Sequence, residues 1–119
     1  MEPLITPEQF QQLLRNGSNN AFRQANKLDT LDYWPVVKIF APWGSATWLL
    51  SELDPAEPDI AFGLCDLGMG EPEMGSVRLS ELESISIHGL TLERDLYFTA
   101  KMTITEYWKK ARELGHIQT

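Results

Sequence analysis

The hydrophobic and polar positions along the chain predict a small antiparallel sheet with a helix at each end. In the middle of the chain, short apolar stretches alternate with turns, and the two clearest turns are Pro42–Ser45 and the acidic segment 54–59. The stretch between these turns has apolar residues on both faces, which is typical of a central strand. We predict strands at 36–40, 46–53, 60–65 and 77–79, and a further extended segment at 92–99.

Capping residues predict the N-terminal helix. Thr6 and Gln9 have the spacing of a capping box, and Pro7 occupies the first helical position, where its missing N–H costs nothing. Apolar residues then recur at helical spacing as far as Asn16–Gly17, a pair that commonly ends a helix. We therefore predict a helix over residues 7–16, followed by an ordered connection to the first strand.

The C-terminal helix has the clearest signals in the chain. Thr103 and Glu106 again have capping-box spacing, an apolar stripe follows, and Gly115 is placed to end the helix. The segment Ser80–Glu83 has the same capping-box spacing and predicts one or two helical turns between the strands.

These elements predict a single α+β domain over residues 1–119. The N-terminal helix and its connection occupy 1–35, the sheet core occupies 36–100, and the C-terminal helix lies in 101–119. We expect an antiparallel sheet of about four to five strands, with the N- and C-terminal helices packed on one face.

Composition predicts a cytoplasmic protein. The 119 residues suffice for one hydrophobic core, and the single cysteine, Cys65, cannot form an internal disulfide. The first residues lack the pattern of a secretory signal, and the apolar stretches are far shorter than the roughly 20 residues of a membrane span.

Charge gathers in one part of the sequence. The formal net charge is −7, and residues 51–100 contain eleven acidic and two basic side chains, a net charge of −9. Such a segment repels phosphate groups, so we expect no direct binding of nucleic acid or of a membrane surface, and a protein with a basic surface as the partner. The candidate partner-binding residues are Trp43, Glu52, Asp54, Glu57, Asp59, Glu71 and Glu73. Two roles stay open for Trp43, a contact for the partner or a lid over the protein's own core. The oligomeric state also stays open.

No set of residues predicts a catalytic site or a cofactor. Cys65 lies on the small-residue face of a predicted buried strand, where a free cysteine usually acts as a compact apolar side chain. The alternative is a small-ligand binder or an enzyme whose site is assembled from residues distant in sequence, namely Cys65, Asp66, His88 and Arg94.

Metal and phosphate binding are not expected either. Asp54, Glu57 and Asp59 share a turn with two prolines, whereas a calcium loop needs an ordered ligand series and a glycine. The glycine-containing segment Gly68–Gly75 lacks the pattern of a phosphate loop at a helix start, since carboxylates and a proline stand where phosphate would lie.

The strings ATWLLSELDP and FGLCDLG, within residues 36–100, resemble the domain of unknown function family 2958. The resemblance implies a small cytoplasmic bacterial protein of the kind carried by plasmids, integrative elements and phages, beside transfer, replication or anti-defence genes. It brings no catalytic residue. We therefore expect a non-enzymatic, acidic accessory protein of a mobile genetic element that binds a protein partner, with anti-defence inhibition (anti-restriction or anti-CRISPR) as one form of that role.

Overall fold

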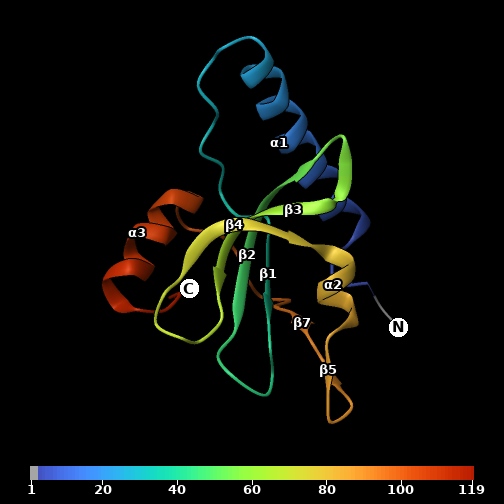
Figure 1. Ribbon diagram of the computed structural model, residues 1–119, viewed down its shortest axis with the longest axis vertical. Helices are drawn as coiled ribbons and strands as arrows, with labels where there is room; N and C mark the ends of the chain where they lie inside the picture. The colour runs from blue at the N-terminus through green and yellow to red at the C-terminus, as the bar shows by residue number, and fades with distance from the viewer. Residues whose placement is uncertain (1–2) are drawn as a thin grey trace.

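A computed structural model describes residues 3–119 of the protein. Five strands of the described chain form one antiparallel sheet in the order β4-β3-β2-β1-β7, and two more form a separate hairpin (Figure 1). The elements are α1 (Pro7–Ala25), β1 (Val37–Phe40), β2 (Thr47–Asp54), β3 (Glu57–Asp66), β4 (Glu73–Arg78), α2 (Leu79–Ser84), β5 (Ser86–Ile87), β6 (Leu90–Thr91), β7 (Glu93–Arg94) and α3 (Ile104–Leu114). The predicted α+β class is confirmed.

The sheet follows from the alternation of apolar residues in its central strand. Trp48 and Leu50 of β2 point to one face and Leu49 points to the other, and all three are buried. The same alternation continues across the strand pair, because Trp48 lies opposite Cys65 and Leu49 lies opposite Leu64. Since both faces of β2 are apolar, both need a cover.

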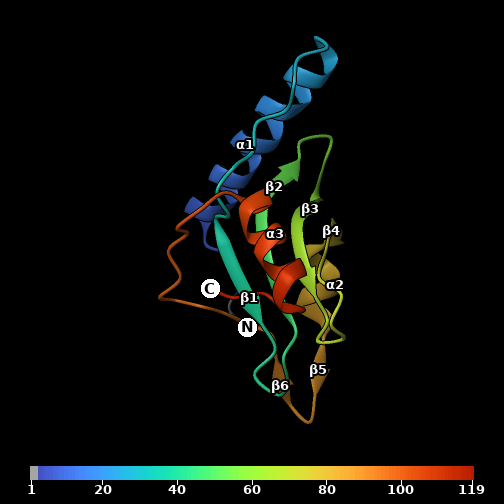
Figure 2. The same ribbon diagram turned by 90° about the vertical axis from the view of Figure 1, so that its left-hand side faces the viewer.

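The helices provide those two covers, and this corrects one detail of the prediction. Leu13 of α1 and Leu82 of α2 pack in one core cluster with Leu50, whereas Tyr107 of α3 packs in a second cluster with Leu49. Figures 1 and 2 show α3 on one side of the sheet and α1 and α2 on the other. The expectation that both terminal helices lie on one face is therefore wrong, because the second apolar face would then have met water.

α1 is longer than predicted, since it continues through Asn16–Gly17 to Ala25. A side chain at Gly17 would place its Cβ 1.6 Å from the carbonyl oxygen of Leu53, so glycine lets the helix lie directly against β2. The buried Asn16 donates from Nδ2 to the Ser51 carbonyl oxygen at 2.9 Å. These two residues are a packing site and not a helix end.

The remaining helix signals were partly correct. Thr103 and Glu106 form the predicted capping box of α3, and Gly115 follows it with φ of 81°. α2 exists, but its N-cap is Arg78, which makes no side-chain capping bond, so the predicted capping box at Ser80 is wrong. The hydroxyl of Ser80 donates instead to Asp59 at 2.6 Å.

The predicted extended segment 92–99 is mostly irregular, because only β7 joins the sheet. Within residues 3–119, none of the helices is both long and apolar enough to cross a membrane.

Candidate functional site

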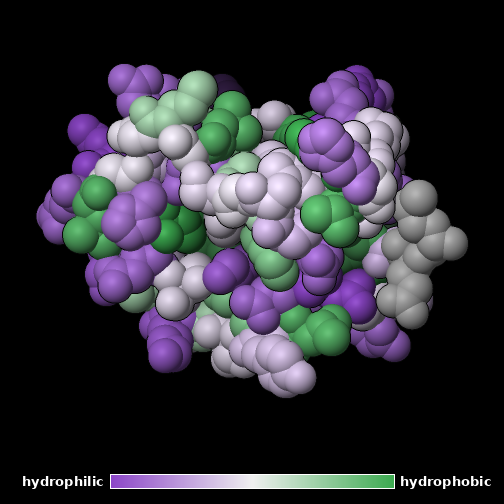
Figure 3. Space-filling model, turned by 90° about the horizontal axis from the view of Figure 1, so that it is seen from below, coloured by the Kyte–Doolittle hydropathy of each residue, from purple (hydrophilic) through white to green (hydrophobic). Residues whose placement is uncertain are grey.

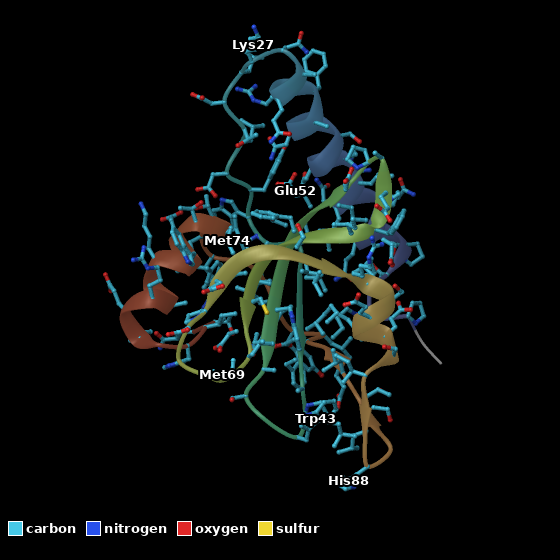
Figure 4. The ribbon with its side chains drawn as sticks, in the orientation of Figure 1. Lys27, Trp43, Glu52, Met69, Met74 and His88 are labelled. Carbon is cyan, nitrogen blue, oxygen red and sulfur yellow. The ribbon has the colours of Figure 1, made fainter. Side chains whose placement is uncertain are left out.

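A cleft of about 600 Å³ lies where the far half of α1 and the 26–35 connection extend beyond the sheet. In Figure 1 this helix and connection project from the top of the molecule, and the end of β2, the start of β3 and the start of α3 lie beneath them. Figure 4 shows Glu52 at the base of the projection, with Lys27 far away at its tip. Residues from five separate parts of the sequence therefore meet around this cleft.

Glu52 reaches the cleft because β2 contains a bulge. The register of β2 against β3 shifts between Leu50 and Glu52, so Ser51 is an extra residue. The bulge allows Leu50 and Leu53 to pack in the same core cluster while Glu52 turns away from it. An acidic side chain is thus placed beside the core without entering it.

Asn20 of α1 connects three parts of the cleft wall. Its Oδ1 accepts a hydrogen bond from the Leu31 backbone N–H at 2.8 Å, and its Nδ2 lies 3.2 Å from the Leu31 carbonyl oxygen and 3.1 Å from Glu52 Oε1. Asn20 itself is buried. This one amide fixes the connection against the helix and orients the Glu52 carboxylate.

The other end of the connection is attached to α3. The Ile104 backbone N–H donates to the Tyr33 carbonyl oxygen at 2.8 Å, and the Thr105 N–H donates to Asp32 Oδ1 at 3.2 Å. The Tyr33 hydroxyl is buried and has no hydrogen-bond partner within residues 3–119. Such a group costs about 1–3 kcal/mol when nothing pairs with it.

The cleft is negatively charged. Asp32, Glu52 and Asp54 line it, and no lysine, arginine or histidine is among the described residues of its wall. Burial raises the pKa of Glu52 above its ordinary value, and the hydrogen bond from Asn20 opposes this in part. A cationic group entering the cleft would relieve the cost of keeping this carboxylate charged.

Large apolar side chains are exposed on the same projection. Phe22, Leu28, Leu31 and Trp34 are each between 45% and 65% exposed, and all lie on α1 or on the connection. Aromatic side chains are enriched in protein interfaces, and exposed large apolar side chains that gather on one part of a surface often mark them. Among these four residues, Leu31 also lines the acidic cleft, and we call the cleft with Leu31 in its wall the projection face, a candidate interface.

The structure brings only part of the predicted acidic residues together. Glu52 and Asp54 lie in the cleft, with Asp54 Oδ1 also accepting the Ala56 N–H at 2.9 Å. Glu57 and Asp59 instead face Arg78, whose Nη1 lies 2.8 Å from Glu57 Oε1 and 3.6 Å from Asp59 Oδ2. Arg78 therefore offsets one of the two negative charges of this pair.

Hydrogen bonds also give Glu57 and Asp59 a structural role. Asp59 accepts from both the backbone N–H and the hydroxyl of Ser80, which lowers the Asp59 pKa, and Arg78 lowers it further. The contact with Glu57 in turn raises the Arg78 pKa. These residues connect β3 to the start of α2.

Glu71 and Glu73 lie at the opposite end of the β3–β4 pair, since Glu73 pairs with Cys65 while Arg78 pairs with Ile60. The predicted residues therefore form three separate groups and not one acidic surface. Trp43 is partly buried and packs against the core cluster of α1, as expected of a lid.

The residues of the alternative ligand or enzyme site do not converge. Asp66 is buried and accepts the Gly68 and Ile117 backbone N–H groups at 2.8 and 2.9 Å. Arg94 donates to the Leu4 carbonyl oxygen at 3.2 Å. His88 is exposed in the β5–β6 turn with φ of 52° (Figure 4). Burial raises the pKa of the half-buried Cys65 thiol, which keeps it protonated at neutral pH.

Comparison with known proteins gives the class of this chain. The model of the family described as "Protein of unknown function (DUF2958)" matches residues 4–118, nearly the whole chain. The chain belongs to this family. Searches among curated proteins and among solved structures found no significant match.

Proposed function

We propose that the protein is a non-enzymatic, acidic accessory factor that binds a protein partner with a basic surface, and that the projection face is its binding site. The observation that carries the proposal is the concave group of three carboxylates, Asp32, Glu52 and Asp54, with no base in the described wall around them. Cationic side chains of a partner are the groups that such a site attracts.

The chemistry of the cleft supports recognition more than bond making. Its polar groups are held by hydrogen bonds to the fold, as Asn20 and Asp32 illustrate, and neither cysteine nor histidine is among its described lining residues. A nucleophile beside a positioned base is the arrangement that covalent catalysis needs. The same negative charge disfavours DNA, RNA and anionic membranes as direct ligands.

The biological setting is part of the proposal. We infer that the protein acts in the cytoplasm of a bacterium as a product of a plasmid, integrative element or phage, which is the setting that the resemblance of its sequence implies. Anti-defence inhibition, by binding a restriction or CRISPR effector, is the form of this role that fits an acidic surface best. Effectors that handle nucleic acid carry basic surfaces, and an acidic protein can occupy them.

Affinity purification followed by mass spectrometry tests the proposal, with the captured partner then titrated against variants. Glu52→Gln combined with Asp54→Asn removes two charges but keeps acceptors for Asn20 and for the Ala56 N–H. We expect the partner's Kd to rise about tenfold or more, corresponding to roughly 1.4 kcal/mol. Added salt should weaken the parent complex more than the variant complex.

The matched control removes two carboxylates elsewhere. Glu8→Gln with Glu113→Gln changes the net charge equally, and both residues are exposed and outside the cleft. Equal affinity losses in the two double variants would contradict a site at the projection face. For the anti-defence role, phage plating on cells with a restriction or CRISPR system should increase when the protein is expressed, and this increase should disappear with the cleft variant.

A further inference from the structure

We propose that β4 and the groove beside it form a second docking site, which binds an extended segment of a partner protein as an additional strand of the sheet. The segment has an apolar centre and basic residues at its two ends. This site is separate from the projection face and goes beyond the function proposed above.

The first observation is the free edge of β4. β4 ends the sheet, with β3 on one side, and none of the described residues pairs with its other side. In Figure 1 no further strand lies along the outer edge of β4, and α2 follows its end. Natural edge strands are usually protected by proline, lysine or a bulge, yet Glu73–Arg78 pairs with β3 in one continuous register and has neither residue within it. Its backbone groups can therefore pair with an added strand.

The second observation is an apolar groove of about 490 Å³ next to this edge. It lies over β3 and β4 beside α2, whereas α1 lies against β2. Small residues of β3 and β4 form its floor and larger apolar side chains stand around them. The residues concerned are Gly63, Cys65 and Gly75 on the floor, and Met69, Leu82 and Ile85 around it.

Exposed apolar side chains continue from the groove. Leu67 and Met69 are 56% and 77% exposed on one side, and Ile87 and Leu90 are exposed on the β5–β6 hairpin. Seen from below, the surface is notched between two lobes that both carry hydrophobic side chains (Figure 3). Side chains on one face of an added strand would bury this surface.

Charge decides between the possible occupants. Glu71 and Glu73 lie near the start of β4 and Glu81 lies beyond its end on α2, and the described lining of the groove contains no base. A second copy paired antiparallel across a two-fold axis would bring Glu71 and Glu73 of one chain towards Glu81 of the other, which is unfavourable, and Arg78 at that end is already paired with Glu57 and Asp59 of its own chain. A partner segment with basic ends meets both acidic rims.

A synthetic peptide tests the site. The peptide is capped, has the length of β4, and carries lysines at both ends with alternating valine and threonine between them. Titration into the isotope-labelled protein should shift the backbone amide signals of 73–78 and of groove residues at roughly millimolar peptide or below. The same peptide with glutamate ends should bind about tenfold more weakly. Absence of shifts in 73–78 would overturn the proposal.

Gly75→Leu blocks the groove without a clash in the fold. A Cβ on Gly75 meets no atom within 4 Å, so the added side chain can occupy the groove floor. We expect at least a tenfold loss of peptide affinity, roughly the effect of one lost interface contact. Gly44→Leu is the matched control, since a Cβ there also meets no atom within 4 Å and Gly44 is outside the groove. Unchanged binding by Gly75→Leu would refute strand addition at this site.

A charge swap gives an independent test. Glu71→Lys with Glu73→Lys should reverse the preference, so that the glutamate-ended peptide binds more tightly than the lysine-ended one. Glu113→Lys, outside the groove, should keep the parent preference. Analytical sedimentation of the parent protein and of Gly75→Leu tests whether a second copy of the chain occupies the groove. If the parent protein is a dimer and Gly75→Leu is a monomer, a second copy is the occupant and the proposal is overturned.

Discussion

At the scale of single residues, Gly17 allows α1 to lie directly against the backbone of β2 at Leu53. Replacement by alanine would place a Cβ 1.6 Å from the Leu53 carbonyl oxygen, a backbone atom that cannot move away alone. We expect Gly17→Ala to lower the free energy of unfolding by about 2–4 kcal/mol, despite the better helix propensity of alanine. Urea denaturation measures the loss. Gly44→Ala is the control and should change stability by less than about 0.5 kcal/mol, because a Cβ there meets no atom.

Glu52 is expected to reduce stability at neutral pH. Its pKa is raised in the folded protein relative to the ordinary value of 4.5, mainly by burial, so the folded state binds its proton more tightly than the unfolded state does. Stability therefore falls as pH rises through and above that value. Glu52→Gln should be more stable than the parent protein at pH 7, and the difference should disappear in acid, below the unfolded pKa.

Thermal unfolding of both proteins across this pH range measures the effect, and Glu113→Gln is the exposed control. A parent protein that is the more stable of the two at pH 7 would contradict a desolvated carboxylate at position 52. Confirmation would indicate that the charge is retained for recognition at a cost in stability.

At the scale of elements, Asn20 holds the middle of the 26–35 connection through two hydrogen bonds, both to the backbone of Leu31. Asn20→Ala leaves the Leu31 N–H without its acceptor and Glu52 without its donor. We expect a stability loss of about 1–3 kcal/mol, faster hydrogen exchange at the Leu31 amide, and weaker binding of the partner. Asn19→Ala, a change to the exposed neighbour on the same helix, should leave all three unchanged. Continued protection of the Leu31 amide in Asn20→Ala would refute the proposed role.

The elements also explain which parts of the structure the sequence could predict. Local signals were sufficient for α3, where Thr103 and Glu106 cap each other within one turn, and for the alternation in β2. The signals at Gly17 and Ser80 were misread because their partners, Leu53 and Asp59, are distant in sequence. A helix end and a close helix–strand contact both favour glycine, so the residue type alone could not separate them.

The projection face was found only in part for the same reason. Charge alone predicts Glu52 and Asp54 as binding residues, but the cleft also needs Asp32 from the connection and Asn20 from α1. One signal was present in the sequence: Asn16 and Asn20 are four residues apart and therefore share a helix face, where two buried amides need partners. Because the helix is predicted to end at Asn16, Asn20 falls outside it and the shared helix face is not recognised from the sequence.

At the scale of the whole molecule, the three acidic groups should differ in their affinity for a cation. Glu57 and Asp59 already contact Arg78, and Glu71 and Glu73 line a pocket together with Arg112, whereas the cleft acids converge on one concave space with no base in its described lining. Arginine methyl ester, a small guanidinium ligand, should therefore shift the amide signals around Leu31, Asp54 and Thr105 first, at concentrations of roughly 1–10 mM. A basic protein is too large to distinguish binding at one acidic group from binding at another, so a small cation is the better choice.

Glu52→Gln with Asp54→Asn should remove these shifts, and Glu8→Gln with Glu113→Gln should retain them. Larger shifts at 57–59 than in the cleft would mean that the ion pairs with Arg78 open readily in solution, and the projection face would lose its place as the cation site.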